Sequence, residues 1–202
     1  FATQGDGLWR LDKNNVWKQY KHVENDSTSL VSDQVNCLAI GEKGQLYAAT
    51  SEGLCEFLPS KGIFRRISID APSQDFTSLV ISQGVMWIST SKGIVKYTPG
   101  EPVQLLNKYD GLTCDQFMPN AGLLASDGRI YFGSTRGFNC FYPYLVKINQ
   151  VAPPVAITSV ELFGQPIEAG SDQLEKSLSH AAELNLSHNE NTINISFAAL
   201  SY

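Results

Sequence analysis

Four charged side chains occupy equivalent places in four short glycine-containing motifs: Asp6, Glu52, Lys92 and Arg136. If the fold brings these four equivalent positions to one face, the charged groups could bind the hydroxyls of a sugar. An arginine there could bind a uronate carboxylate through two parallel hydrogen bonds. Solvated turn residues would show the same composition, so that interpretation stays open. The candidate ligand-binding residues are therefore Glu52, Lys92 and Arg136, together with Trp9, whose ring could stack on a sugar.

Two tryptophans differ in their expected surroundings. Trp87 occupies an aromatic position that recurs in the middle of a strand, so we expect it in the core. Trp9 stands at a position that is not uniformly apolar, because the other copies of the motif place Cys55, Val95 and Asn139 there. Exposure of Trp9 is therefore plausible from the sequence.

The sequence contains no recognisable catalytic or metal-binding motif. There is no G-x-S-x-G, H-E-x-x-H or P-loop segment. The histidines His22, His180 and His188 are scattered, and the four cysteines form no C-x-x-C pair. We therefore expect no catalytic residue, no metal site and no cofactor.

We expect the four cysteines, Cys37, Cys55, Cys114 and Cys140, to be free and to behave as small buried apolar residues. A bridge between Cys37 and Cys55 is disfavoured, because they would lie on non-adjacent strands of one sheet, about 9.5 Å apart. An oxidising compartment permits disulfides, so a bridge elsewhere stays open.

The charged motifs belong to an internal repeat. Three segments align without a gap, GQLYAATSEGLCEF, GVMWISTSKGIVKY and GRIYFGSTRGFNCF, and a degenerate copy, FATQGDGLWRL, opens the chain. Each full copy has a turn glycine, an aromatic residue, a small hydroxyl residue and a second glycine that restarts the chain. Flanking apolar runs complete four short strands per roughly 40–45 residues, which is typical of a β-propeller blade.

The repeat predicts an all-β chain that begins with part of a β-propeller. Strands are expected near residues 35–40, 45–50, 53–58 and 63–67, and in the same pattern over residues 76–106. The first unit lacks its innermost strand, and the last runs into Pro143 without an obvious outer strand. About three and a half blades do not close a ring. Residues 1–150 are therefore predicted to be the C-terminal blades of a longer propeller.

A second domain is expected over residues 151–202. Residues 151–154, VAPP, have the composition of an extended linker. Strands are predicted over residues 155–163, 183–187 and 192–200, with a turn at 164–166. Three strands with polar turns favour an immunoglobulin-like β-sandwich, and they are too few to complete one, so this domain is predicted to be truncated.

The overall composition excludes some classes of partner. Hydrophobic residues make up 43% of the 202 residues, which is enough for a core, and the formal net charge is −5. A nucleic-acid-binding protein normally has a basic face, so nucleic acid is not an expected partner. No apolar run approaches the ~20 residues of a membrane span, and the sequence does not open with a basic and then apolar segment.

The order of these motifs resembles a known family. LVSDQVNCLAIGEKGQLYAATSEGLCEF resembles the two-component regulator propeller repeat, and YDGLTCDQFMPNAGLLASDGRIYFGSTRGFNCFYP resembles its terminal copy. APPVAITSVELFG and NTINISFAALSY resemble the start of the triple-tyrosine (Y_Y_Y) domain that follows such propellers. Compared with that family, the resemblance implies that the sequence departs by lacking the early blades and the tyrosine-rich half of that domain.

The resemblance implies a sensor. In that family, the propeller and the triple-tyrosine domain form the periplasmic region of a hybrid two-component histidine kinase and response regulator, whose parent chain is anchored in the inner membrane. Its ligand would be an oligosaccharide, and its output the control of polysaccharide-utilisation genes. Two alternatives stay open: a propeller enzyme that acts on polysaccharide, which would need a clustered acid/base pair, and a structural spacer that transmits a signal.

Incomplete closure also predicts self-association. Open blade faces are expected to expose large side chains, namely Tyr47, Trp87, Tyr131 and Phe141. Leaving such residues in water is costly, since burial of each is worth about 1.5–3 kcal/mol. We therefore expect a homodimer in which two open faces cover each other.

Overall fold

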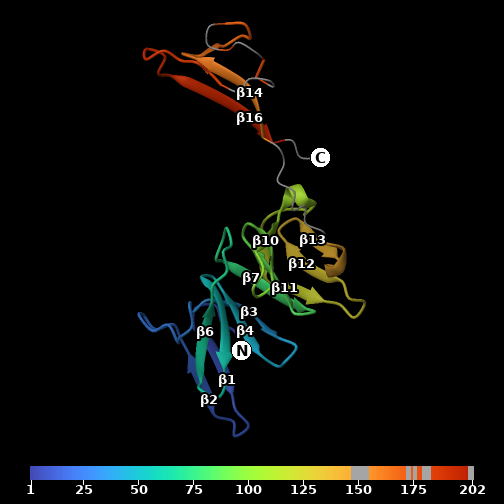
Figure 1. Ribbon diagram of the computed structural model, residues 1–202. Helices are drawn as coiled ribbons and strands as arrows, with labels where there is room; N and C mark the ends of the chain where they lie inside the picture. Colours follow the sequence, from blue (N-terminus) through green and yellow to red (C-terminus); the bar gives the residue numbers. More distant parts are fainter. Residues whose placement is uncertain (147–154, 172–173, 175–176, 179–182, 200–202) are drawn as a thin grey trace. The chain divides into compact units, whose positions relative to one another are not determined.

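The computed structural model describes residues 1–146, 155–171, 174, 177–178 and 183–199, which fold mainly into antiparallel β-strands (Figure 1). Two short 3-10 helices, η1 (Lys108–Asp110) and η2 (Pro143–Leu145), interrupt the strands. The chain divides into two compact units, Phe1–Ile148 and Asn149–Tyr202. None of the helices in the described part of the chain has the length and apolar character needed to cross a membrane. The expected linker at 151–154 lies outside the described residues.

Four antiparallel sheets make up the first unit, and within each sheet every strand pairs with the next one along the chain. The two middle sheets have four strands each, the first has two and the last has three. The strands are β1 (Leu8–Leu11) and β2 (Trp17–Tyr20); β3 (Val35–Ile40), β4 (Leu46–Thr50), β5 (Gly53–Leu58) and β6 (Ile63–Ile67); β7 (Phe76–Ser82), β8 (Val85–Thr90), β9 (Gly93–Tyr97) and β10 (Gln104–Leu106); and β11 (Phe117–Leu124), β12 (Ile130–Ser134) and β13 (Gly137–Phe141).

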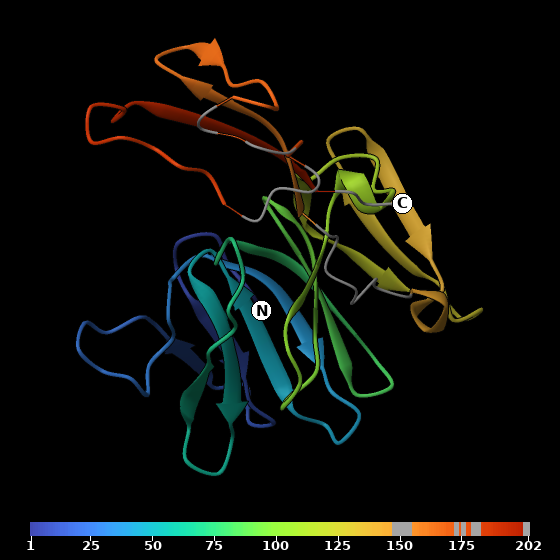
Figure 2. The ribbon, with the colours of Figure 1, turned by 45° about the horizontal axis from the view of Figure 1, so that its top comes forward.

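The sheets are arranged as consecutive blades of a propeller (Figure 2). The first strands of the last three sheets lie side by side, since β7 contacts both β3 and β11, and β11 also reaches β3. Such convergence of innermost strands is typical of blades around a common axis. The predicted all-β fold with a partial propeller is confirmed, and the strands of the two complete blades fall where the repeat places them.

A separate apolar core lies between each pair of neighbouring blades. Alternate residues of a strand point to opposite faces of its sheet, so each blade contributes to two cores. In the blade β3–β6, Cys55 packs in the core shared with the first blade, while Leu54 packs in the core shared with the blade β7–β10. A complete blade is therefore stabilised from both sides.

The last blade is covered on one face only within the described residues. Ile130 and Phe132 are fully buried against the blade β7–β10. On the opposite face, Leu123 is 60% exposed and Phe138 is 63% exposed. An apolar face of this kind invites contact with another surface.

Of the four side chains expected to be exposed on open blade faces, two are buried and two are half-buried. Tyr47 and Trp87 are buried, because the blade that follows each of them covers it, so their expected exposure is wrong. The place of Trp87 in the core, predicted from the repeat, is confirmed. Phe141 is half-buried, with its ring centroid 5.0 Å from that of Trp87, and Tyr131 is also half-buried.

All four cysteines are free, as expected. Cys37 and Cys55 are buried and lie on β3 and β5, which are separated by β4 in the same sheet. The prediction of burial is wrong for the other two, since Cys114 is half-buried and Cys140 is exposed. Cys140 is exposed because it lies in the last blade, where no other blade covers it within the described residues.

The second unit contains one antiparallel sheet with the strand order β15–β14–β16. Its strands are β14 (Val155–Leu162), β15 (Gln165–Pro166) and β16 (Ile193–Ala199), so the strands predicted at 155–163 and 192–200 are confirmed. The turn predicted at 164–166 is displaced, since Phe163 and Gly164 form it and the next two residues pair with β14. The second sheet of a sandwich is not among the residues that the structure describes.

The strand predicted at 183–187 is wrong. Glu183 to Ser187 alternate in polarity, but they do not form a strand. A strand needs a partner for its backbone groups, and β14 pairs instead with β15 and β16. Alternation in sequence indicates a compatible face but does not provide that partner.

Candidate functional site

One turn structure holds the repeated charged residues. Thr50 Oγ1 donates a hydrogen bond to the carbonyl of Gly53 at 2.8 Å, and it accepts one from the backbone N–H of Glu52 at 3.2 Å. The same pair of bonds recurs in the next two blades, where Thr90 and Ser134 provide the hydroxyl and Lys92 and Arg136 the N–H. The small hydroxyl residue of the repeat therefore closes the turn that presents the charged side chain.

A second repeated contact ties each turn to the segment that precedes its blade. The hydroxyls of Ser32 and Ser51 lie 3.0 Å apart, and those of Ser73 and Ser91 lie 2.9 Å apart. In the last blade the equivalent pair is Cys114 with Thr135, at 4.0 Å between Sγ and Oγ1. A thiol thus takes the place of a hydroxyl at this one position.

The segment between β10 and β11 forms one wall of the site. Asn107 caps η1, since its side chain accepts a hydrogen bond from the backbone N–H of Tyr109, and Gly111 ends the helix with φ +96°. The carboxylate of Asp115 accepts the backbone N–H of Lys108 at 2.7 Å. The carbonyl of Asp115 also accepts the N–H of Gly93, which ties the segment to the blade β7–β10.

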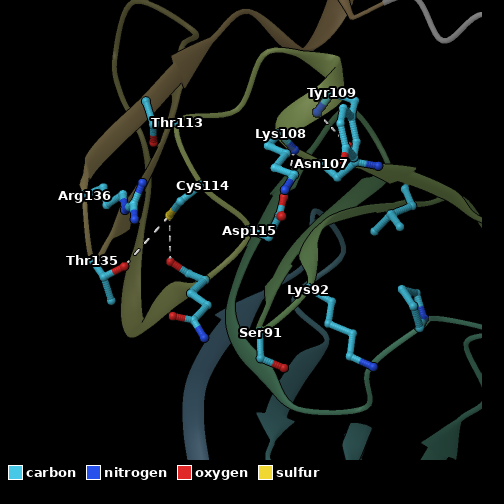
Figure 3. Close-up of a pocket in the computed structure, with 13 residues that line it drawn as sticks. Ser91, Lys92, Asn107, Lys108, Tyr109, Thr113, Cys114, Asp115, Thr135 and Arg136 are labelled. Carbon is cyan, nitrogen blue, oxygen red and sulfur yellow. Dashed lines mark hydrogen bonds between the residues drawn. The ribbon is translucent and has the colours of Figure 1, made fainter.

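These elements border an open pocket of about 660 Å³ between the last two blades. Its walls come from the β8–β9 turn, the segment before β11 and the β12–β13 turn (Figure 3). A volume of 300–1,000 Å³ is the usual range for small-ligand sites. The residues that give it its chemistry are Ser91, Lys92, Asn107, Lys108, Tyr109, Thr113, Cys114, Asp115, Thr135 and Arg136.

Three cations line this pocket without a carboxylate partner. Lys92, Lys108 and Arg136 are exposed, and none of them forms an ion pair with any residue that the structure describes. Elsewhere in the unit Arg65 and Arg129 are paired with Glu56 and Asp127, whereas Arg10 and Arg66, like the pocket cations, form no ion pair with the described residues. The pocket therefore has an excess of positive charge over its single carboxylate, that of Asp115.

The environment of Cys114 favours negative charge. Partial burial raises the pKa of its thiol, but hydrogen bonds outweigh burial and hold that pKa below the ordinary value. The hydrogen-bond partners are Ser134, Gln116, Thr135 and Arg136, the second and last through their backbones. Cys55 differs, because desolvation there outweighs the hydrogen bonding and charge that lower the pKa of its thiol, and that pKa is raised.

The structure brings two of the four predicted binding residues together. Lys92 and Arg136 both line the pocket. Glu52 lies outside it, where its carboxylate accepts a hydrogen bond of 3.5 Å from Ser32. Trp9 also lies outside it and packs edge-on against Trp17, with 6.3 Å between ring centroids.

Sequence reasoning missed Lys108 and Tyr109, which come from a connection rather than from the repeated turn. A signal was available, because in an antiparallel blade the second turn and the connection to the next blade lie at the same end of the strands. The segment NKYDG, with its capping asparagine and terminal glycine, marks an ordered connection there.

A second, smaller pocket lies beside the innermost strands. It has a volume of about 410 Å³ and is lined by Ala2, Thr3 and Gln4, by the start of β3 and by Pro119 and Asn120 of β11. No charged side chain lines it. Among the residues that the structure describes, no three histidine, cysteine or acidic side chains are grouped so that they could hold a metal ion.

Several solved structures are similar to this chain. The extracellular domain of BT4673 from B. thetaiotaomicron, described as a hybrid two-component system, is 16% identical, with a TM-score of 0.52 over 98% of this chain. That of BT3049 from the same organism is 18% identical over 96% of this chain, with a TM-score of 0.42. Virginiamycin B lyase from Staphylococcus aureus is 13% identical over 75%, with a TM-score of 0.47.

This chain corresponds to only part of each of these proteins. This chain spans 26% of the BT4673 chain, 35% of the BT3049 chain and 53% of the lyase chain. No family model and no curated protein matches the sequence. At these identities the likeness to BT4673 establishes the fold alone, which is that of part of its extracellular domain.

Proposed function

We propose that this chain is part of the extracytoplasmic sensor region of a bacterial hybrid two-component system and that it binds an oligosaccharide without cleaving it. Residues 1–150 would be the C-terminal blades of the sensor propeller, and residues 151–202 the start of a triple-tyrosine domain. The parent chain would be anchored in the inner membrane, with this region in the periplasm, and would control polysaccharide-utilisation genes.

The observation that supports this proposal most is the pocket between the last two blades. It is large enough for a small ligand, and it combines hydroxyl, amide and charged groups with an exposed aromatic ring. Sugars present hydroxyls to polar groups and apolar ring faces to aromatic ones. The likeness in fold to the extracellular domain of BT4673 adds to the argument.

The chemistry of the pocket favours binding over catalysis. A glycoside hydrolase of the usual kind needs two carboxyl groups on either side of the scissile bond. Among the described residues that line the pocket, Asp115 is the only one with a carboxylate, and one of its oxygens already accepts a backbone N–H. The proposal therefore assigns recognition, and no reaction, to this site.

The test is a binding screen with product analysis. The purified chain is titrated by calorimetry with oligosaccharides from several polysaccharide classes, and each ligand is afterwards analysed by chromatography. We expect at least one class to bind and to be recovered intact. Shortened products would indicate an enzyme, and a folded chain that binds none of the classes would favour a structural spacer.

A further inference from the structure

The cations of the pocket outnumber its acidic groups, although the chain as a whole is acidic. The sequence has 20 acidic and 15 basic residues, so a random surface would be negative. Yet three basic side chains meet one carboxylate in the pocket, and the described residues provide no ion-pair partner for any of the three. Three basic side chains around one pocket favour an anion as its occupant, because opposite charges attract.

We infer that the pocket binds the carboxylate or sulfate groups of an acidic oligosaccharide, with Lys92, Lys108 and Arg136 as the anion-binding residues. This inference rests on the proposed function and narrows its ligand class.

The three cations of the pocket come from three different structural elements. Lys92 and Arg136 stand on the equivalent turns of two consecutive blades, and Lys108 stands on the segment that joins those blades. They therefore line different walls of one pocket (Figure 3). An arginine can bind a carboxylate or sulfate through two hydrogen bonds, whereas a lysine acts as a point charge, so Arg136 is expected to fix orientation.

The remaining groups suit a carbohydrate better than a free inorganic anion. Tyr109 is 87% exposed beside the pocket, and the ammonium group of Lys108 lies 5.0 Å from the centre of its ring. An exposed aromatic ring next to a cation can stack on a sugar ring whose acidic group faces that cation. Ser91 and Thr135 add hydroxyls on either side.

The local environment agrees with an anionic ligand. The same β12–β13 turn that presents Arg136 also contributes hydrogen bonds that favour the ionised form of Cys114. These hydrogen bonds are made to the Cys114 sulfur, so they show that this wall tolerates a negative charge at one of its own residues.

The experiment compares ligands that differ only in charge. A short oligogalacturonate is matched with its methyl-esterified form, and a sulfated galactan oligosaccharide with its desulfated form, and all four are titrated against the full chain. We expect at least one acidic ligand to bind about tenfold or more tightly than its neutral partner, as charge-assisted hydrogen bonds provide. Which acidic ligand prevails separates a carboxylate from a sulfate.

Substitution of each cation by glutamine tests whether it binds the acidic group of the ligand. Arg136→Gln, Lys92→Gln and Lys108→Gln should each weaken binding of the acidic ligand about tenfold and leave any binding of the neutral form unchanged. Lys43→Gln is the matched control, because Lys43 is an exposed lysine in the β3–β4 turn outside the pocket. Unchanged melting temperatures would show that the variants fold.

The possible outcomes distinguish a failure of the anion-binding inference from a failure of the proposed function. Equal binding of acidic and neutral partners, insensitive to the three variants, would overturn this inference and leave the proposed function intact. Equal binding of inorganic sulfate and the acidic oligosaccharides would also overturn it, because the sugar would then contribute nothing. If no oligosaccharide of either kind binds the folded chain, both the inference and the proposed function fail.

Discussion

The blade β7–β10 and the blade β11–β13 have the same residue pattern but different surroundings. Ile94 and Phe138 each follow the second glycine of their repeat. Ile94 is fully buried in the core shared with the last blade, whereas Phe138 is 63% exposed. The blade β3–β6 behaves like the complete one, since the equivalent Leu54 is also buried.

This difference shows that the repeat places an apolar side chain on the face of each blade but does not determine whether that side chain is buried. The apolar residue after the glycine is suited to a neighbouring blade, and whether it is buried depends on whether that blade is there. Pairs of matched substitutions in the two blades can therefore measure what a neighbour contributes.

The largest contrast is expected from truncation of the matched apolar residues. Ile94→Ala should lower the free energy of unfolding by about 2–5 kcal/mol, because it leaves a cavity in a closed core. Phe138→Ala should change it by about 0.5 kcal/mol or less at concentrations where the chain is monomeric, because the ring is then mostly in water. Chemical denaturation of the two variants measures both values. Equal losses would mean that the last blade is covered after all.

The two repeat glycines give the next contrast. Gly93 has φ +120°, and a Cβ there would lie 2.3 Å from the carbonyl oxygen of Leu106 in β10. Gly137 has φ +112°, but a Cβ would meet nothing within 4 Å. Both alanine variants carry backbone strain, and only Gly93→Ala adds a clash, so it should cost about 1–3 kcal/mol more. Thermal melts of the pair provide the measurement.

The open face of the last blade is expected to drive self-association into a homodimer. Phe138→Glu and Leu123→Glu should each weaken the dimer about tenfold or more, since burial of one such side chain is worth about 1.5–3 kcal/mol. Sedimentation equilibrium at several concentrations measures the dissociation constant.

Ile40→Glu is the control for that experiment, because Ile40 is 72% exposed but lies at the end of β3, in another blade. A dimer that Ile40→Glu weakens as much as Phe138→Glu would point to a different interface. A monodisperse monomer would show that this face is stable in water.

The smallest contrast concerns the hydroxyls that close the turns. Thr90 is fully buried, and its hydroxyl bonds Gly93 and Lys92, so Thr90→Val should cost about 1–2 kcal/mol. Ser134 makes the same bonds at a turn in contact with water, so Ser134→Ala should cost a few tenths of a kcal/mol, about the size of a surface change. Urea unfolding resolves the first, and a loss of similar size in the second would contradict the argument.

Much of the first unit could be predicted because its signals are local and repeated. Turn glycines and alternating apolar residues place the strands of the two complete blades, and each strand pairs with its neighbour in sequence. The second unit lacks such repetition. Its β16 pairs with β14 across a long separation, and residues 183–187 have the alternation of a strand without a partner. Pairing over long distances cannot be derived from alternation alone.

The candidate site could be predicted only in part, for a related reason. Lys92 and Arg136 were found because they occupy one position of the repeat. That same reasoning grouped Glu52 with them, although its turn belongs to the blade β3–β6 and does not line the pocket between the last two blades. Lys108 and Tyr109 occur once, in a connection, so only the three-dimensional arrangement of two blades brings them to the turns.

The turn that holds the charged residues has an evolutionary consequence. Its two hydrogen bonds use a hydroxyl, a glycine carbonyl and the backbone N–H of the middle residue, but not that residue's side chain. After duplication of a blade, that side chain can therefore diverge without loss of the turn, and the three copies here indeed differ as Glu52, Lys92 and Arg136. Ligand preference can drift at these positions while foldability is inherited unchanged.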